Sequence, residues 1–110
     1  MTNLRGKTEE YIKAFDNKNL EEVSKFFNQD SILFDPANPR GVKGKNNIMA
    51  MIDGIFKDHD RLSFVDKNIF IDQNTSIIEF EIALNEKKLV GVDLIEWDGS
   101  FIKELRAYLY

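Results

Sequence analysis

Apolar residues recur at helical spacing in the first half of the chain and at alternate positions in the second half. An apolar stripe with a 3.6-residue period predicts a helix over residues 3–16. The stripe consists of Leu4, Tyr11, Ile12 and Phe15. Asn19 can cap a short second helix, with Glu22 as its reciprocal partner. The strongest helical stripe predicts a third helix over residues 44–57, and it consists of Ile48, Met51, Ile52, Ile55 and Phe56.

A short apolar run predicts a strand over residues 32–35 that ends on Asp35, directly before Pro36. The prolines and glycines that follow are expected to break regular structure until the third helix begins. Alternation then predicts four strands, over residues 62–71, 75–84, 88–97 and 101–110. The first of these contains a break at residues 66–68 that is typical of a bulge. The order α-α-β-α-β-β-β-β favours an α+β fold, a curved antiparallel sheet with helices on its concave face.

Composition narrows the class of protein further. The 110 residues form one predicted domain, 1–110, with no linker or repeat. A net charge of −4 without a basic cluster argues against nucleic-acid binding, and no apolar run is long enough for a membrane span. The chain has no Cys, and its first ten residues lack the apolar core of a signal peptide, so we expect a cytoplasmic protein. Nine Phe residues suggest a large apolar interior or cavity.

Three residues are candidates for acid–base chemistry. Asp93 shares an otherwise apolar strand face, where burial would raise its pKa and make it a hydrogen-bond donor; the alternative is a solvated acid at a pocket rim. Asp35 is either a general base facing a pocket or a turn acid bonded to the amides that follow it. Tyr11 is either a donor to an oxyanion or a core tyrosine bonded to a carbonyl.

Other side chains are assigned by strand alternation. Phe101 is expected on the inward face of the last strand, and His59, the only histidine, is read as a solvated loop residue with no metal or other cofactor. Apolar and aromatic side chains are also expected on the outer face of the sheet, where they predict a homodimer through that face. These side chains are Val90, Val92, Leu94 and Tyr108.

Three segments resemble the NTF2-like superfamily, in particular its SnoaL-like and ketosteroid-isomerase-like branch. They are DSILFDP, GVKGKNNI and the closing GVDLIEWDGSFIKELRAYLY, and the resemblance covers nearly the whole chain. It implies a cone in which a curved sheet wraps around three helices and encloses a pocket. Ketosteroid isomerases carry a tyrosine on the first helix, a base Asp before Pro and a protonated Asp on a late strand. Tyr11, Asp35 and Asp93 match these positions.

Two departures limit what the resemblance implies. Phe27 and Ile52 stand where some members have supporting tyrosines, which argues against a steroid substrate. Related epoxide hydrolases use an Asp–Arg–Asp set, whereas Gly91 stands two residues before Asp93, which argues against that reaction.

The expected ligand is a small apolar molecule. Two functions fit these residues: cofactor-free isomerisation or cyclisation of a small carbonyl compound, and a non-catalytic ligand-binding or dimeric interaction module. The predicted pocket lining consists of Phe15, Phe27, Ile52, Phe56, Gly91, Ile95, Trp97, Leu105, Ala107 and Leu109.

Overall fold

The computed structural model describes residues 3–110, so residues 1 and 2 of the predicted domain lie outside it. Its helices are α1 (Leu4–Asp16), α2 (Leu20–Ser24) and α3 (Lys45–Asp58). The predicted cap of the second helix forms, because Asn19 Oδ1 accepts from the Glu22 amide at 3.1 Å. The bond expected in return, from the Glu22 side chain to the Asn19 amide, is replaced by an ion pair between Glu22 Oε1 and Lys25 Nζ at 2.9 Å. No helix among the described residues is both long and apolar enough to cross a membrane.

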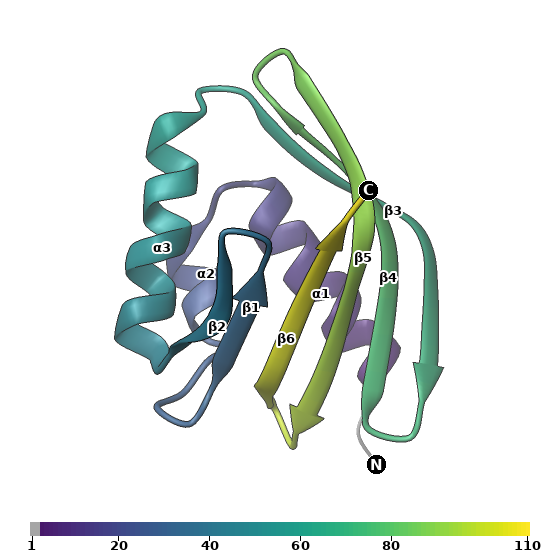
Figure 1. The fold of residues 1–110 in the computed structure, drawn as a ribbon. Helices are drawn as coiled ribbons and strands as arrows, with labels where there is room; N and C mark the ends of the chain where they lie inside the picture. Colours follow the sequence, from purple (N-terminus) through teal and green to yellow (C-terminus); the bar gives the residue numbers. More distant parts are fainter. Residues whose placement is uncertain (1–2) are drawn as a thin grey trace.

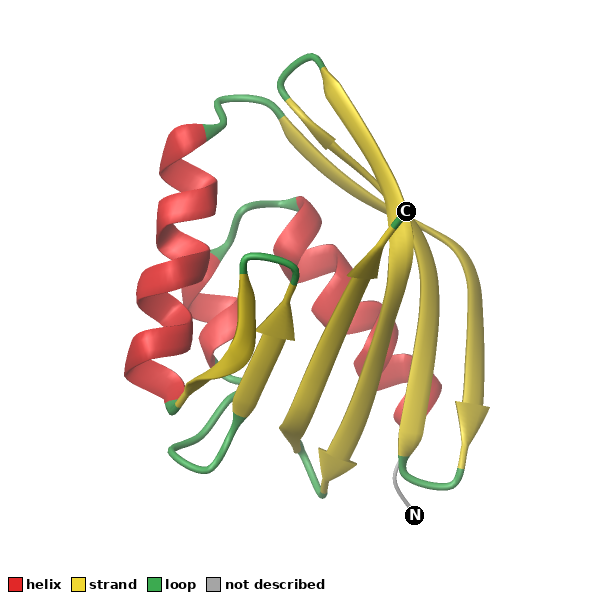
Figure 2. Ribbon diagram, viewed as in Figure 1, coloured by secondary structure: helices red, strands yellow, loops and turns green. Residues whose placement is uncertain are grey.

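Six strands form one curved sheet around the helices (Figures 1 and 2). They are β1 (Ile32–Asp35), β2 (Asn38–Lys43), β3 (Leu62–Asp72), β4 (Thr75–Leu84), β5 (Lys87–Asp98) and β6 (Phe101–Leu109). The order across the sheet is β2-β1-β6-β5-β4-β3. All neighbours are antiparallel except β1 and β6, which run parallel, so the sheet is mixed rather than purely antiparallel. The predicted α+β cone is confirmed.

The expectation of an irregular segment after Asp35 is wrong, because this segment forms β2 and pairs with β1 as a hairpin. Pro39 is tolerated because β2 is an edge strand, where a missing backbone donor breaks no sheet hydrogen bond. Gly41 adopts a φ of +89°, and an added Cβ would lie 2.9 Å from atoms of Ile32 and Phe34. Proline and glycine therefore shape an edge strand here instead of ending the sheet.

The last strand is out of phase with the simple alternation that the sequence suggests. Phe101 is 40% exposed, whereas Ile102 is fully buried, so the inward placement of Phe101 is wrong. The register between β5 and β6 shifts at Trp97, which faces Ile102 while Glu96 faces Glu104. Lys103 is thus the extra residue of a bulge. Beyond it Leu105 returns to the inward face, as expected.

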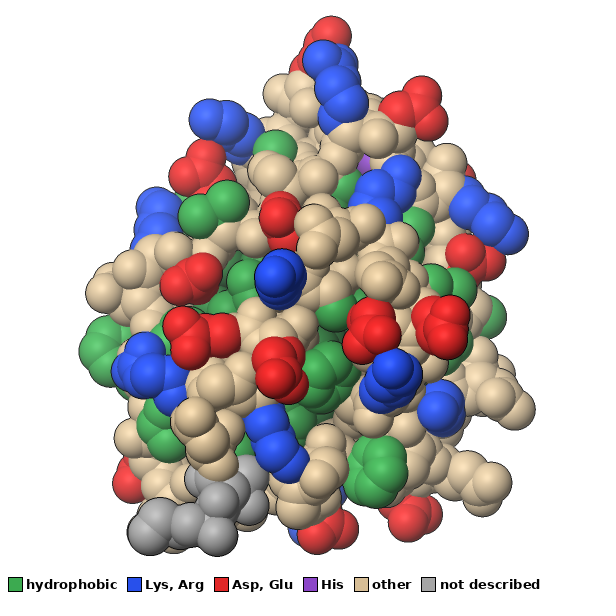
Figure 3. Space-filling model, turned by 180° about the vertical axis from the view of Figure 1, so that it is seen from behind, with side chains coloured by type: hydrophobic (Ala, Val, Ile, Leu, Met, Phe, Trp, Pro, Cys, Tyr) green, Lys and Arg blue, Asp and Glu red, His purple; other side chains and the backbone are tan. Residues whose placement is uncertain are grey.

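The face seen from behind carries acidic and basic side chains intermingled over the helices (Figure 3). Apolar side chains lie between them in small groups. This face of the described chain therefore offers no continuous basic surface of the kind that a phosphate backbone binds.

Gly91 marks a close approach of β5 to β6, and replacing it should weaken the fold. A Cβ added there would lie 2.1 Å from the Tyr108 carbonyl oxygen and 3.0 Å from Leu109 Cδ2. We expect Gly91→Ala to lower the free energy of unfolding by about 1–3 kcal/mol, as overpacked sites do. Urea denaturation followed by circular dichroism measures this change.

Gly54→Ala is the matched control. Gly54 lies within α3, and an added Cβ there meets no heavy atom within 4 Å. This variant should gain about 0.5–1 kcal/mol from the better helix propensity of alanine. Equal stability of the two variants would show that β5 and β6 can separate without cost at Gly91.

Candidate functional site

A cavity of about 280 Å³ lies between α1, α3 and the concave face of the sheet. Apolar side chains from both helices and from five of the six strands form most of its lining. Four residues with titratable side chains also line it, namely Tyr11, Asp35, His59 and Asp93. An apolar space with a few polar groups is the usual form of a small-molecule site.

Asp93 is the most deeply placed of these groups. It projects from the middle of β5, where Ile78 and the small Ala107 are its neighbours on the adjacent strands, and it is 4% exposed. Burial raises its pKa from 3.8 to about 7, because the apolar surroundings disfavour the charged form. The Asp93 carboxyl makes no hydrogen bond to any described residue. Every fully enclosed side-chain oxygen among these residues does have a partner, so the Asp93 carboxyl is not fully enclosed. The carboxyl therefore faces the cavity.

Tyr11 reaches the same space from α1. It is 2% exposed, and its ring packs against those of Phe15, Phe26 and Phe27. Its pKa is well above 10.0, first because burial disfavours the phenolate and second because the charge of Asp93 repels it. The Tyr11 hydroxyl consequently stays protonated and is a permanent donor. Like the Asp93 carboxyl, it has no hydrogen-bond partner among residues 3–110 and is not fully enclosed by protein atoms.

Asp35 lies at the rim, in the tight turn between β1 and β2. Its Oδ1 accepts from the Asn38 amide at 2.8 Å and from Asn38 Nδ2 at 2.9 Å. These are the local bonds of a turn acid, but the side chain also lines the cavity beside Pro36 and Ala37. Because Oδ2 has no hydrogen bond to a described residue, it is the oxygen free to take a proton.

His59 is the titratable cavity residue that the sequence interpretation missed, beside apolar lining residues from β1, α3, β3, β4 and β5. It is half-buried rather than solvated, and its Nδ1 lies 2.8 Å from the Ile55 carbonyl oxygen. A carbonyl only accepts, so the neutral ring carries its proton on Nδ1 and keeps a lone pair on Nε2. Lys18 Nζ donates to the His59 carbonyl at 2.7 Å and fixes the loop. The sequence feature that could have indicated this placement is the spacing of four residues between Ile55 and His59, which continues the apolar stripe of α3.

The structure divides the predicted lining into two groups. Those that line the cavity are Phe15, Ile52, Leu105, Ala107 and Leu109. Those that lie in the core around it instead are Phe27, Phe56, Gly91, Ile95 and Trp97.

Contacts with neighbouring side chains explain why Trp97 and Phe56 of the second group do not line the cavity. The Trp97 indole donates to Ser76 Oγ at 2.6 Å, and Ser76 Oγ lies 2.8 Å from Thr8 Oγ1. The Phe56 ring meets Phe15 edge-on at 5.1 Å. The cone is therefore solid at one end and hollow at the other.

The fold and the polar groups in its hollow end define a small α+β cone with an apolar pocket. Residues 8–105 match the SnoaL-like domain family, and the chain belongs to this family. The predicted NTF2-like, SnoaL-like membership is thus confirmed. No protein with a curated description matches the chain.

Solved structures show the same fold. An NTF2-like protein of unknown function from Cytophaga hutchinsonii has a TM-score of 0.85 at 18% identity, covering 100% of this chain and 92% of its own. A candidate ketosteroid isomerase from Kribbella flavida has a TM-score of 0.86 at 14% identity, with 97% and 77% covered. A candidate SnoaL-like polyketide cyclase from Shewanella denitrificans has a TM-score of 0.84 at 16% identity, with 100% and 92% covered. At these identities the likeness concerns the fold alone.

Proposed function

We propose that this protein binds a small, mostly apolar molecule through one carbonyl oxygen, to which Tyr11 and protonated Asp93 donate. The observation that carries the proposal is the pair of buried polar groups that face an apolar cavity and make no hydrogen bond within the described part of the chain. A buried donor gains most when a ligand supplies the missing acceptor. The cavity volume of about 280 Å³ favours a ligand at or below the lower end of drug size.

The same site supports proton transfer on a carbonyl compound. Asp35 would take a proton from the carbon next to the carbonyl and return it elsewhere on the ligand, while Tyr11 and Asp93 hold the enolate oxygen. This is an isomerisation or cyclisation without a cofactor, and the names of the Kribbella and Shewanella proteins are in keeping with it. The alternative is a binding module without turnover, favoured by the two turn bonds that Asp35 Oδ1 already accepts.

Binding of 2-acetylnaphthalene, an apolar aromatic ketone, tests the donor pair. We expect calorimetric titration to show weaker binding at pH 8.5 than at pH 6, because Asp93 loses its proton around pH 7 and then repels the carbonyl oxygen. Asp93→Asn should bind equally at both pH values, since an amide donates at either. Tyr11→Phe should weaken binding about threefold to tenfold at pH 6, the worth of one hydrogen bond.

Tyr108→Phe is the control for the loss of a tyrosine hydroxyl, because Tyr108 lies outside the cavity. It should bind the ketone as the unchanged protein does. Binding that does not depend on pH, or that survives Tyr11→Phe unaltered, would contradict donation by this pair.

We also propose a homodimer through the outer face of the sheet. Val90, Val92 and Leu94 are half-buried there, while Tyr108 and Phe70 are each more than half exposed. A two-fold axis would bury this face against itself. Sedimentation at micromolar concentration should give the mass of two chains, and a monomer with native circular dichroism would refute the proposal.

A further inference from the structure

The sheet opens at the rim of the cavity because β1 and β6 pair over only part of their length. Their last paired residues are Phe34 and Arg106. Beyond them the chain turns at Asp35 into the β1–β2 hairpin, whereas β6 continues to Leu109 and, among residues 3–110, pairs there with β5 alone. The edge of β6 that would face β1 is therefore free over its last three residues.

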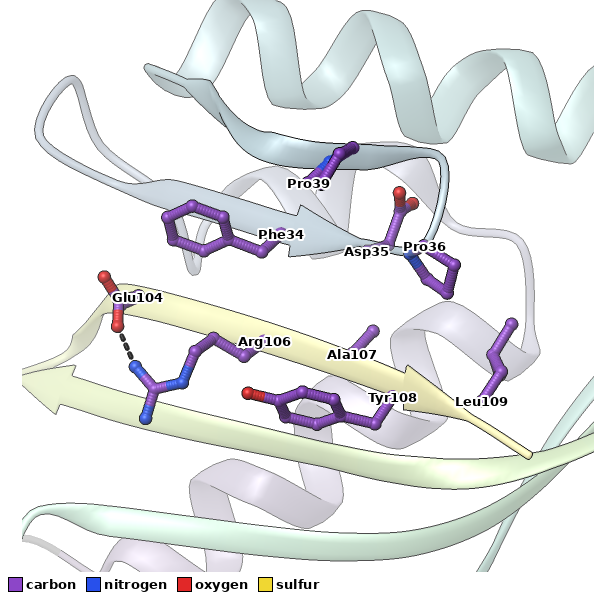
Figure 4. Close-up of a pocket in the computed structure, with 9 residues that line it drawn as sticks. All are labelled: Phe34, Asp35, Pro36, Pro39, Glu104, Arg106, Ala107, Tyr108 and Leu109. Carbon is purple, nitrogen blue, oxygen red and sulfur yellow. Dashed lines mark hydrogen bonds and ion pairs between the residues drawn. The ribbon is translucent and has the colours of Figure 1, made fainter.

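A groove of about 460 Å³ lies on the outer side of this opening (Figure 4). It shares four lining residues with the internal cavity, namely Asp35, Pro36, Ala107 and Leu109. In Figure 4, Arg106 and Tyr108 lie on one side of β6, and Ala107 and Leu109 lie on the other. Groove and cavity thus meet at a window between the hairpin turn and the end of β6.

The charges along the groove favour a cation. Arg106 Nη1 donates to Glu96 Oε2 at 2.8 Å and also to Glu104 Oε2, so two carboxylates share one guanidinium. Asp35 adds a further carboxylate at the window. Three carboxylates, those of Asp35, Glu96 and Glu104, thus accompany the single guanidinium of Arg106, so the net negative charge of this region favours an ammonium group over an anionic one.

We propose that groove and cavity bind one elongated molecule, with a carbonyl-bearing apolar head in the cavity and a chain that passes through the window and ends in an amine beside Glu104. The part concerning the head rests on the proposed function. The groove is more than an acidic cluster, because it joins a cavity in which Tyr11 and Asp93, both more than nine-tenths buried, have no hydrogen-bond partner among the residues that the structure describes. The ligand class that follows is an amino-terminated amphiphilic ketone.

Three derivatives of 2-acetylnaphthalene test the groove. Each carries at ring position 6 a chain of the same length, ending in an amine, a methyl group or a carboxylate. In low salt at pH 6 we expect the amine to bind about threefold to fivefold more tightly than the methyl compound, the usual worth of a partly exposed ion pair. The carboxylate should bind more weakly than either. The preference for the amine should shrink in 0.5 M NaCl, where exposed charges are screened.

Glu104→Gln isolates the charge, because it keeps the shape of the side chain. The amine should lose most of its advantage and the carboxylate should gain, while the ketone without a chain binds as before. Glu79→Gln is the control, since Glu79 lies on β4 outside the groove and bonds Asn68. It should change none of these affinities.

The outcomes separate the two proposals. If the plain ketone binds as expected but the chains weaken its binding, or if the amine has no advantage or keeps it in Glu104→Gln, the groove inference is overturned and the head site stands. If neither the plain ketone nor its derivatives bind, the proposed function and this inference fall together.

Discussion

Asp93→Asn should raise the free energy of unfolding by about 4 kcal/mol at pH 8 and by little at pH 4. The magnitude follows from the difference between the ordinary pKa of 3.8 and the folded value of about 7, since each unit corresponds to about 1.4 kcal/mol. Asparagine occupies nearly the same volume but cannot ionise. The variant therefore removes the cost of burying a charge and leaves the packing of β5 intact.

The direction of the pH dependence follows from proton binding. In the unfolded chain Asp93 loses its proton near pH 3.8, whereas in the folded protein it keeps it up to about pH 7. Between these values the folded state binds more protons, so its stability falls as the pH rises. The stability that protonated Asp93 provides is complete below about pH 4 and is lost by about pH 7. Above that pH both states are ionised and the cost is constant.

Urea denaturation from pH 4 to pH 8 measures this effect as the difference in the free energy of unfolding between Asp93→Asn and the unchanged protein. That difference should grow with pH, because other titrating groups contribute equally to both and cancel. Asp66→Asn is the control, because Asp66 is an exposed acid on β3. Its curve should stay parallel to that of the unchanged protein. A constant difference for Asp93→Asn would mean that this carboxyl is solvated, and its role as a neutral donor would then be wrong.

Sequence periodicity predicts much of this fold, because burial on one side of an element leaves a regular trace. The first and third helices and the four long strands each follow from such a stripe or alternation, and the second helix follows from its Asn19 cap. The Asp98–Gly99 turn joins the last two strands as expected. The edge strand β2 leaves no such trace. Its residues are mostly exposed or half-buried, and Pro39 and Gly41 are typical of loops. Only its pairing with β1 makes it a strand.

Two further errors come from features that a single strand or helix cannot reveal. The bulge at Lys103 depends on the register with β5, so alternation alone assigns Phe101 to the wrong face. His59 follows the last residue of α3, where the charged sequence around it resembles a loop. Its ring nevertheless turns back to the Ile55 carbonyl and reaches the cavity.

The depth of the cavity is likewise a property of the whole cone. Alternation correctly assigns Asp93 and Trp97 to one face of β5. It does not determine that the end near Trp97 is filled by the rings and hydroxyl groups of other elements, while the end near Asp93 is hollow. That difference depends on side chains from α1, α3 and five strands that meet only in the folded chain.

Asp35→Asn should abolish the isomerisation of a small cyclic β,γ-unsaturated ketone and leave its binding intact. In the proposed reaction Asp35 would remove the proton between the carbonyl group and the double bond, Tyr11 and Asp93 would hold the dienolate oxygen, and the proton would return to the far end of the former double bond. A positioned general base contributes about 10²–10⁴-fold to a rate, and that factor is the expected loss. Asparagine can still accept both bonds from Asn38 through its amide oxygen, so the turn should survive.

Formation of the conjugated enone is followed by its ultraviolet absorbance, and binding of the ketone is measured by calorimetry on the same samples. Asp93→Asn should be milder than Asp35→Asn, because an amide remains a donor to the dienolate oxygen. Asp30→Asn, an exposed acid before β1, is the control and should keep full turnover. If Asp35→Asn retains turnover while His59→Gln loses it, the base is the His59 imidazole, which also lines the cavity. If the unchanged protein binds the ketone without converting it, the two donors serve recognition alone, and the turn bonds of Asp35 are its whole role.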